Sequence, residues 1–183
     1  QDPILQTAIM HAQFELIHPF LDGNGRTGRI LIPLFLWHKK NIKAPVFYIS
    51  EYLEANRDRY YGCLRSISRD GDWEGWVRFF LQAVTTQAEE NALKANQVLS
   101  LYQQMKSRIT AITNSAHAIQ ILDTMFANPI INSTTFIRHS SLNSQTGRRI
   151  VNKMKEEQIL STLQPSAGSR PEILVFKDLM EIL

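Results

Sequence analysis

Residues 18–29 decide the fold of this chain, and they read His18-Pro19-Phe20-Leu21-Asp22-Gly23-Asn24-Gly25-Arg26-Thr27-Gly28-Arg29. Upstream of them, apolar residues recur at spacings of three and four through Leu16. Downstream, an apolar run extends from Ile30 to Trp37. The upstream spacing is typical of an amphipathic helix. The sequence therefore predicts two helical segments joined by a glycine-containing loop.

The helix before this loop has clear start and stop signals. Asp2 can cap it, and Pro3 takes the first helical position, where a missing N–H costs little. A proline follows His18 and disfavours helical geometry there, so we expect the helix to end near His18 and residues 19–25 to form the loop. In the apolar segment after the loop, Pro33 predicts a kink or a short irregular turn.

The glycines of the loop suit a phosphate site. Gly23 and Gly25 let the backbone turn its N–H groups inward as an anion-binding nest. They lie where the next helix begins, and a helix N-terminus adds unpaired N–H donors and a partial positive charge. Arg26 and Arg29 are three residues apart and share a helix face, where guanidinium groups can grip phosphate oxygens in pairs. A nucleoside triphosphate is the ligand that these residues fit.

Two further residues of this stretch could take part in a reaction of the bound nucleotide. Asp22 supplies the hard oxygen ligand that Mg²⁺ prefers, and Mg²⁺ commonly takes one carboxylate together with phosphates and waters. His18, at the end of the first helix, can take a proton from an incoming hydroxyl near neutral pH, which is the requirement on a general base. The stretch therefore combines a base, a metal ligand, an anion site and two cationic side chains.

Other glycine-rich motifs compete with this interpretation. Residues 23–28 also match the G-x-G-x-x-G pattern of dinucleotide-binding folds, but that pattern requires a preceding strand within a βαβ unit. Residues 4–17 have helical spacing instead. A P-loop is excluded because no Gly-Lys-Ser/Thr follows the glycines. A purely structural turn with solvated arginines stays open as the alternative.

The whole stretch resembles the signature of the Fic (filamentation induced by cyclic AMP) family, H-P-F-x-[D/E]-G-N-G-R-x-x-R, at every fixed position. Most members transfer AMP from ATP to a Ser, Thr or Tyr hydroxyl of a target protein. The resemblance implies a protein adenylyltransferase, a nucleotidyltransferase that uses ATP and Mg²⁺. In it, His18 would deprotonate the target hydroxyl, Asp22 would hold Mg²⁺ at the α and β phosphates, and Arg29 would bind the γ-phosphate. The implied nucleotide-binding residues of the stretch are Gly23, Asn24, Gly25, Arg26, Thr27, Gly28 and Arg29.

The resemblance continues more weakly to about residue 106 and implies a mainly α fold with a Fic-type helical core over residues 1–107. Ser50 is expected to cap a helix that reaches about Ser66, and Asp72 a helix that extends toward residue 106. Tyr60 and Tyr61 fall where many relatives place an aromatic pair beside the adenine or ribose. Packing in the core is an equal alternative for both tyrosines.

Relatives also have upstream helices, a β-hairpin flap and an inhibitory helix, none of which we expect within these residues. Residues 86–91 fit the inhibitory pattern [S/T]-x-x-x-E-[G/N] formally, with Glu90 as its acid. The pattern is short and falls within a predicted core helix. We therefore interpret Glu90 as part of a solvated helix face.

Residues 108–183 have a different character and are expected to form a small winged helix-turn-helix domain. Helices are predicted over residues 116–126, 134–139 and 145–158, followed by a β-hairpin with strands at residues 159–163 and 173–176. The third helix resembles a recognition helix, because it carries residue types that contact bases or phosphates. These are Asn143, Gln145, Arg148, Arg149 and Lys153, while Ile150, Val151 and Met154 are expected to pack inward. Basic residues exceed acidic ones by only two after residue 107, so a protein-docking role competes with DNA binding.

Composition limits the classes of protein to which this chain can belong. The 183 residues are 44% hydrophobic and 20% charged, which is typical of a globular chain. No apolar run is long enough to cross a bilayer, so we expect no membrane partner. The single Cys63 favours a reducing cytoplasm. Alternatives to AMP transfer are another donor, AMP removal, or a nucleotide-sensing DNA-binding regulator, and a homodimer is left open.

Overall fold

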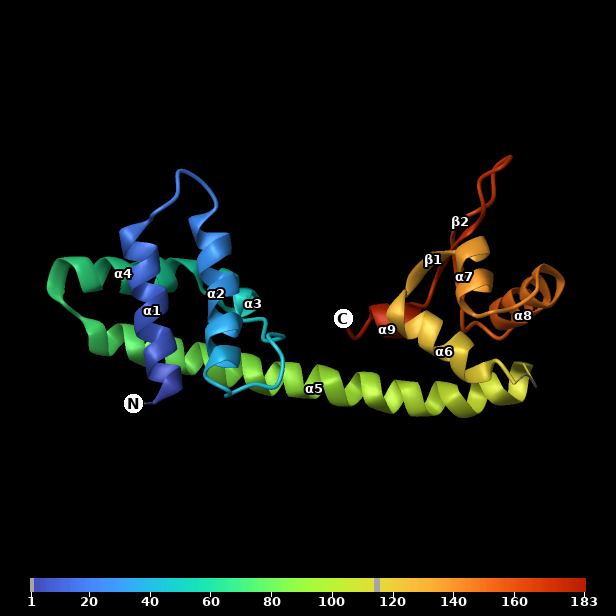
Figure 1. The fold of residues 1–183 in the computed structure, drawn as a ribbon, viewed down its shortest axis with the longest axis horizontal. Coiled ribbons are helices and arrows are strands. Elements are labelled where there is room, and N and C mark those ends of the chain that lie inside the picture. Colours follow the sequence, from blue (N-terminus) through green and yellow to red (C-terminus); the bar gives the residue numbers. More distant parts are fainter. Residues whose placement is uncertain (1, 114–115) are drawn as a thin grey trace. The chain divides into compact units, whose positions relative to one another are not determined.

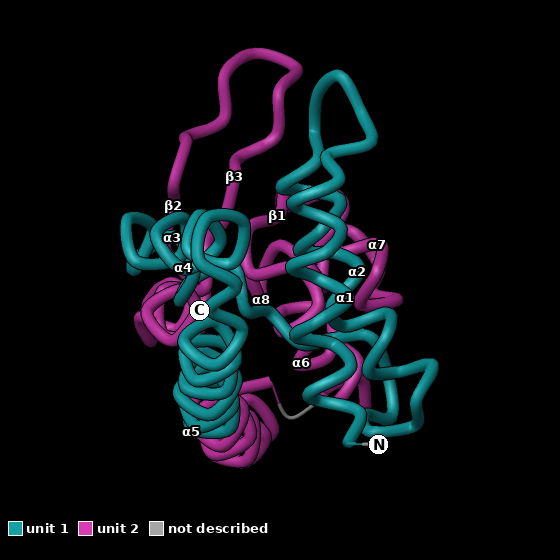
Figure 2. Tube along the Cα trace, turned by 90° about the vertical axis from the view of Figure 1, so that its left-hand side faces the viewer, with its two compact units in different colours: residues 1–93 teal, residues 94–183 magenta. Residues whose placement is uncertain are grey.

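The computed structural model describes residues 2–113 and 116–183. Two compact units divide these residues, one over residues 1–93 and the other over residues 94–183 (Figures 1 and 2). The helix α5 (Trp73–Thr113) begins in the first unit and ends in the second. The expected domain boundary at residues 107 and 108 falls inside α5 and stays a prediction. The expectation of a mainly α fold is confirmed by the helices and the small sheet described below.

The two helices around the glycine loop are α1 (Pro3–Ile17) and α2 (Asn24–His38). The Asp2 side chain caps α1 as expected, with its Oδ1 accepting from the backbone N–H of Ile4 at 2.7 Å. The helix α2 runs without interruption through Pro33, so of the expected kink or irregular turn the irregular turn is wrong. A proline inside a helix removes one backbone hydrogen bond, and the other bonds of α2 remain to hold it.

The expected single helix from Ser50 to Ser66 is two helices, α3 (Ser50–Ala55) and α4 (Arg57–Asp70). Asn56 breaks the run, with φ −114° and ψ 32°, and its side-chain Nδ2 donates to the carbonyl of Tyr52 at 2.9 Å. Asparagine competes in this way with the helical backbone. Ser50 is the first residue of α3 and not its cap.

The core of the first unit is aromatic and centres on the N-terminal part of α5. Asp72 accepts from the backbone N–H of Gly75 at 2.9 Å, which confirms the expected helix start. Trp76, Phe79 and Phe80 are fully buried, and Trp76 Nε1 donates to the carbonyl of Ala8 on α1 at 2.9 Å. Burying such a side chain stabilises the fold by about 2–3 kcal/mol relative to leaving it exposed.

The second unit follows the order α6 (Ala118–Ala127), β1 (Ile130–Asn132), α7 (Ser133–His139), α8 (Ser144–Glu156), β2 (Ser161–Gln164), β3 (Ile173–Val175) and α9 (Lys177–Met180). The three strands form an antiparallel sheet in the order β1-β3-β2, with Leu174 paired to both Ile131 and Thr162. The expected helices and hairpin are present. The strand β1 and the helix α9 were not expected, because segments of three and four residues carry too short a pattern.

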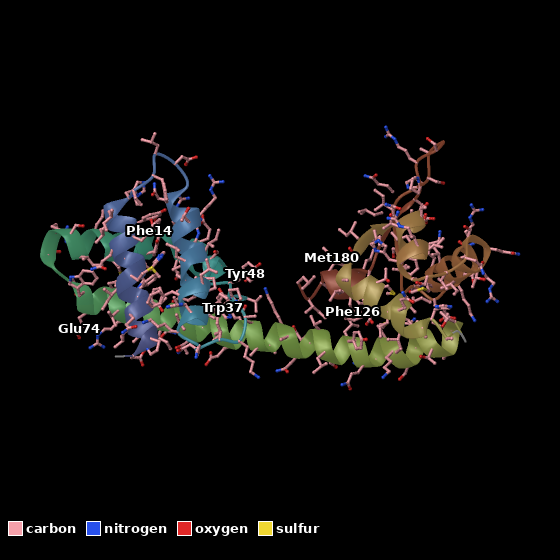
Figure 3. All side chains as sticks on the ribbon, viewed as in Figure 1. Phe14, Trp37, Tyr48, Glu74, Phe126 and Met180 are labelled. Atoms are coloured by element: carbon pink, nitrogen blue, oxygen red, sulfur yellow. The ribbon has the colours of Figure 1, made fainter. Side chains whose placement is uncertain are left out.

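The core of the second unit joins the last part of α5 to the sheet and the helices. Ile109 of α5, Phe136 of α7 and Phe176 after β3 are fully buried. Ile150, Val151 and Met154 of α8 are buried in the same cluster, as the sequence predicts. Phe126 meets Phe176 edge to face at 5.4 Å between ring centroids, and Figure 3 shows Phe126 on α6. No helix in the described ranges is long and apolar enough to span a membrane.

Candidate active site

The loop between α1 and α2 begins at a residue in an unusual backbone conformation. His18 has φ 51° and ψ 57°, in the left-handed region, and its backbone N–H donates to the carbonyl of Phe14 at 3.0 Å. This conformation is uncommon for a residue other than glycine. It ends α1 and leaves the imidazole exposed on the loop.

Asn24 fastens the loop to the start of α2. Its side chain is buried, with Nδ2 donating to the carbonyl of Phe20 at 2.5 Å and Oδ1 accepting from the backbone N–H of Phe20 at 2.9 Å. Both polar atoms of the amide thus bond within the loop. The Asn24 side chain therefore shapes the loop, and a nucleotide contact by this residue stays a prediction.

Asp22 and Gly23 are the last two residues of the loop before α2. Gly23 has φ 82°, a conformation that favours glycine, and its backbone N–H donates to Asp22 Oδ1 at 2.7 Å. The other carboxylate oxygen of Asp22 lies 3.5 Å from an Nη of Arg26. Both side chains are mostly exposed, so this ion pair is weak and the carboxylate is accessible from solvent.

The N-terminus of α2 offers unpaired donors. The first backbone hydrogen bond of the helix runs from the N–H of Thr27 to the carbonyl of Gly23 at 2.9 Å. The N–H groups of Asn24, Gly25 and Arg26 have no acceptor among the described residues, and no side chain caps them. Such a helix end attracts anions. The predicted anion site is therefore present as a set of free N–H groups.

A cleft of about 830 Å³ lies beside this loop within the first unit. Its walls come from the end of α1, the start of α2 and one face of α4. The lining residues are Glu15, Leu16, His18, Gly25, Tyr61, Gly62, Leu64, Arg65, Ser66, Ser68 and Arg69. Among the residues predicted from the sequence, His18, Gly25 and Tyr61 are brought together here.

The two arginines of the stretch line a different hollow. Arg26 and Arg29 border a groove of about 480 Å³ beside α2, together with Ile30, Pro33 and Tyr48. Figure 3 shows Tyr48 in the segment that follows α2, and Trp37 near the end of that helix. The arginines share a helix face, as their spacing predicts. They do not line the cleft that contains His18.

The two tyrosines of α4 have different surroundings. Tyr61 is 38% exposed and lines the cleft. Tyr60 is 3% exposed, and its hydroxyl lies 3.0 Å from Nε2 of His11 in the core. Burial raises the pKa of the Tyr60 hydroxyl above its usual value, and the charge of Glu15 and the neighbouring Tyr61 raise it further. Of the two alternatives for Tyr60, its burial in the core favours packing over a nucleotide contact.

Gly28 and Thr27 do not contact the cleft either. A Cβ on Gly28 would lie 2.2 Å from Glu15 Oε1 and 3.1 Å from the Phe14 ring, so this glycine allows α1 and α2 to pack closely. Gly28 is buried between the helices, and Thr27 is half-buried on α2. Gly28 therefore has a packing role between the two helices, and a nucleotide contact by this residue stays a prediction.

Two residues of the cleft were missed from the sequence. One oxygen of Glu15, Oε1, is buried and has no hydrogen-bond partner among the described residues. Burial raises the pKa of Glu15, while the nearby His18 and Arg29 lower it. Arg65 is exposed, lines the cleft and forms no hydrogen bond or ion pair within the described part of the chain. Spacing could have indicated Glu15, which lies three residues before His18 on the last turn of α1.

Part of the chain is similar to known proteins. Residues 1–36 match the sequence profile of the Fic/DOC family. Protein adenylyltransferase fic-1 from Caenorhabditis briggsae is 32% identical over 91 residues, covering 37% of this chain and 18% of that protein. A probable protein adenylyltransferase from Aquifex aeolicus is 36% identical over 63 residues, which cover 34% of this chain and 20% of the Aquifex protein. Protein adenylyltransferase Fic from Drosophila yakuba is 35% identical over 77 residues, which cover 42% of this chain and 14% of the Drosophila protein.

The match to the Fic/DOC profile lies at the N-terminal end of the chain and includes the residues of the motif. The chain spans about a fifth or less of the length of these curated relatives. Among solved structures, a Fic family protein from Desulfovibrio desulfuricans is 22% identical, with a TM-score of 0.49 over 96% of this chain and 50% of that one.

Proposed function

We propose that this chain carries the catalytic site of a protein adenylyltransferase that transfers AMP from ATP to a hydroxyl of a target protein. One observation carries the proposal: an exposed imidazole and the start of an uncapped helix N-terminus, at His18 and Gly25, line the same cleft. The free N–H groups suit phosphate and the imidazole suits a hydroxyl proton. We propose residues 1–107 as the catalytic domain.

In the proposed reaction the target hydroxyl oxygen bonds to the α-phosphorus of ATP. His18 takes the hydroxyl proton, the bond from the α-phosphorus to the bridging oxygen breaks, and pyrophosphate leaves with that electron pair. The N–H groups of Asn24, Gly25 and Arg26 would hold phosphate oxygens during the transfer, and such preorganised donors act most strongly on developing charge. Arg26 and Arg29, from their neighbouring groove, would contact the terminal phosphates.

The residues of the loop fit a magnesium ion shared with phosphates. Asp22 is an accessible carboxylate next to the free N–H groups, and its only cation is the weakly paired Arg26 among the described residues. When bound, Mg²⁺ would neutralise phosphate charge, and Asp22 would hold it. On the opposite wall, Tyr61 and Ser68 of α4 are the proposed neighbours of the base and ribose.

Labelled ATP tests the proposal. The chain is incubated with Mg²⁺, cell lysate and ATP labelled on the α-phosphate or, in parallel, on the γ-phosphate. Lysate without the chain gives the background of endogenous kinases. Above this background, we expect label in protein only from the α-phosphate, and mass spectrometry of the modified protein should show the mass of AMP. Chain-dependent label from the γ-phosphate alone would overturn the proposal in favour of phosphate transfer.

His18→Ala is the first variant to examine. Removing the imidazole should lower the rate of AMP transfer at least 100-fold, which is the typical contribution of a general base. ATP affinity should change less than threefold, since the N–H groups that hold phosphate remain. Full transfer by this variant, measured beside the wild-type chain, would remove His18 from the base role.

A second candidate function, DNA binding, concerns the second unit, and its local geometry favours it. The helices α7 and α8 are joined by the four residues 140–143, in which Ser141 has φ 53°. A turn of this length between two helices is typical of a helix-turn-helix. Basic residues exceed acidic ones by four over residues 94–183, whereas acidic residues are in excess by one over residues 1–93.

The cationic side chains near α8 are partly available. Arg148 and Arg170 line a polar cavity of about 430 Å³ between α7, α8 and the hairpin. Arg149 is exposed. By contrast, the Lys153 ammonium donates to the carbonyl of Ile112 at 2.7 Å, and the Asn143 side chain caps α8 by accepting from the N–H of Thr146. We propose residues 108–183 as a winged helix-turn-helix that uses these arginines on the DNA backbone.

Salt dependence tests this candidate function. The whole chain is titrated with labelled duplex DNA at several salt concentrations. Arg148→Ala should reduce the slope of log affinity against log salt by about one, as expected for a lost phosphate contact. Lys177→Ala removes the same charge from α9 and serves as the matched control. No detectable binding at low salt would dispose of the DNA role.

A further inference from the structure

His11 is a fully buried imidazole in the core of the first unit, on the face of α1 that meets two other helices. Its Nδ1 lies 3.1 Å from the backbone carbonyl oxygen of Gly28 on α2. Its Nε2 lies 3.0 Å from the hydroxyl of Tyr60 on α4. One side chain thus connects α1, α2 and α4 by two hydrogen bonds.

The partners fix the protonation of the ring. Burial lowers the pKa of His11 to about 4, against the opposing effect of the bond to Gly28, and Arg29 lowers it further. The ring is therefore neutral at physiological pH. Because a carbonyl oxygen only accepts, the proton must lie on Nδ1, and the bare Nε2 then accepts from the Tyr60 hydroxyl. This network has one arrangement of its hydrogens.

The same three helices form the walls of the cleft. The last turn of α1 leads to His18, the first turns of α2 carry Gly25 and the free N–H groups, and α4 carries Tyr61 and Arg65. His11 bonds α2 one turn after Gly25, and it bonds α4 at the residue before Tyr61. The geometry of the cleft therefore depends on where the imidazole holds α2 and α4.

Packing alone does not explain the polar pair of His11 and Tyr60 in this core. Aromatic rings surround the imidazole, with the centroids of Tyr60 and Trp76 at 6.0 Å and that of Phe80 at 6.1 Å. In such an apolar site, replacing both partners of a hydrogen bond by apolar groups can be neutral or stabilising. Hydrogen bonds differ from apolar contacts in fixing direction and distance. A role in geometry accounts for polar groups at this position.

We propose that His11 and Tyr60 are positioning residues, which hold the phosphate-binding start of α2 and the α4 wall at a fixed distance from His18. The expected effect of the two residues on the reaction rate rests on the proposed function. Their expected effect on the position of the loop rests on the structure alone. Neither residue touches the substrate. Their loss should slow the chemical step, because small misplacements of reacting groups reduce rates strongly.

The variant Tyr60→Phe tests the proposal, since it keeps the ring and removes only the hydroxyl. The matched control is Thr7→Val, which removes a buried hydroxyl that bonds within α1 alone, to the carbonyl of Pro3 at 2.7 Å. The rate of AMP and pyrophosphate formation is measured with ATP, Mg²⁺ and water as the acceptor. Melting temperatures are measured in parallel.

We expect Tyr60→Phe to lower kcat at least tenfold with a less than threefold change in the KM for ATP. Thr7→Val should lose a similar amount of melting temperature and keep kcat within twofold. A kcat for Tyr60→Phe within twofold of wild type would overturn the proposal. An equal loss of kcat in both variants would also overturn it, because the effect would then follow stability.

A measurement without turnover separates this proposal from the proposed function. In nitrogen-15 spectra of the whole chain, the His11 ring should carry its proton on Nδ1, and the amide signal of Gly25 should shift in Tyr60→Phe and stay in place in Thr7→Val. A proton on Nε2, or an unchanged Gly25 signal, would contradict the positioning role. If the wild-type chain binds ATP and forms no AMP, the proposed function fails while these spectra still decide the positioning role.

Discussion

Two histidines seven residues apart have opposite surroundings. His11 is enclosed by aromatic rings and bonded at both ring nitrogens, whereas His18 lies exposed on the loop beside the cleft. The motif drew attention to His18, because it comes with a recognisable pattern of glycines and arginines. Nothing in the local sequence distinguishes His11 from an ordinary helix residue, since its partners Gly28 and Tyr60 are distant in the chain.

Burial of His11 should make stability depend on pH. The folded-state pKa is near 4 and the ordinary value is 6.5, so between these values the unfolded chain binds a proton that the folded chain does not. The free energy of unfolding should therefore fall as the pH is lowered from about 6.5 to 4, by roughly 3 kcal/mol in total. Denaturant titrations across this range should show the slope in the wild type and a flatter dependence in His11→Gln. Equal slopes would contradict the buried neutral ring.

The two arginines on the cleft face of α4 should differ in function. Arg65 has no partner within the described residues, whereas Arg69 is bonded to Asp70 through Nε and an Nη, the latter at 2.7 Å. A charge-assisted hydrogen bond contributes about 1.5–3 kcal/mol, so Arg65→Ala should weaken ATP binding roughly tenfold or more. Arg69→Ala is the matched control and should change the affinity less than twofold. Calorimetric titration with ATP gives both values, and equal effects would argue against Arg65 as a ligand-binding residue.

Among the helices and strands, the sequence predicted those features that depend on residues close together in the chain. The caps at Asp2 and Asp72 were indicated by single polar residues with a free side-chain oxygen. Asn143 was interpreted as a base-contacting residue, and its capping of α8 was missed. The break at Asn56 was missed, because asparagine is tolerated in helices and only its bond to the Tyr52 carbonyl shows the competition. The separation of Arg26 and Arg29 from the His18 cleft depends on how α2 packs, which no spacing in the sequence reveals.

The contact between α7 and α8 depends on a glycine. A Cβ on Gly147 would lie 2.6 Å from two carbon atoms of Ile137, so the two helices approach too closely for any side chain there. Gly147→Ala should destabilise the second unit by about 1–3 kcal/mol, the usual cost of overpacking. Hydrogen exchange of α7 and α8 amides measures this change.

Gly62→Ala is the matched control for that experiment. Gly62 lies in α4, and an added Cβ would meet no atom within 4 Å. Because alanine favours the helix over glycine, this variant should stabilise the first unit by about 0.5–1 kcal/mol. A change of stability in the same direction for Gly147→Ala and Gly62→Ala would contradict the packing described for Gly147.

At the scale of the whole chain, two compact units carry different chemistry. The first has the loop, the cleft and a slight acidic excess, and the second has two helices joined by a four-residue turn and the basic excess. The change in sequence character near residue 108 predicted a second domain, and the boundary at residues 107 and 108 stays a prediction. The compact units divide at residues 93 and 94, within the continuous helix α5, where the sequence offers no loop signal.

The proposed function requires that the loop between α1 and α2 binds a polyphosphate beside His18. A crystal structure of the chain with Mg²⁺ and a non-hydrolysable ATP analogue tests this requirement. We expect phosphate oxygens within hydrogen-bond distance of the N–H groups of Asn24, Gly25 and Arg26, with the α-phosphorus next to the His18 imidazole. Phosphates bound elsewhere, with the free N–H groups of α2 still facing solvent, would contradict it.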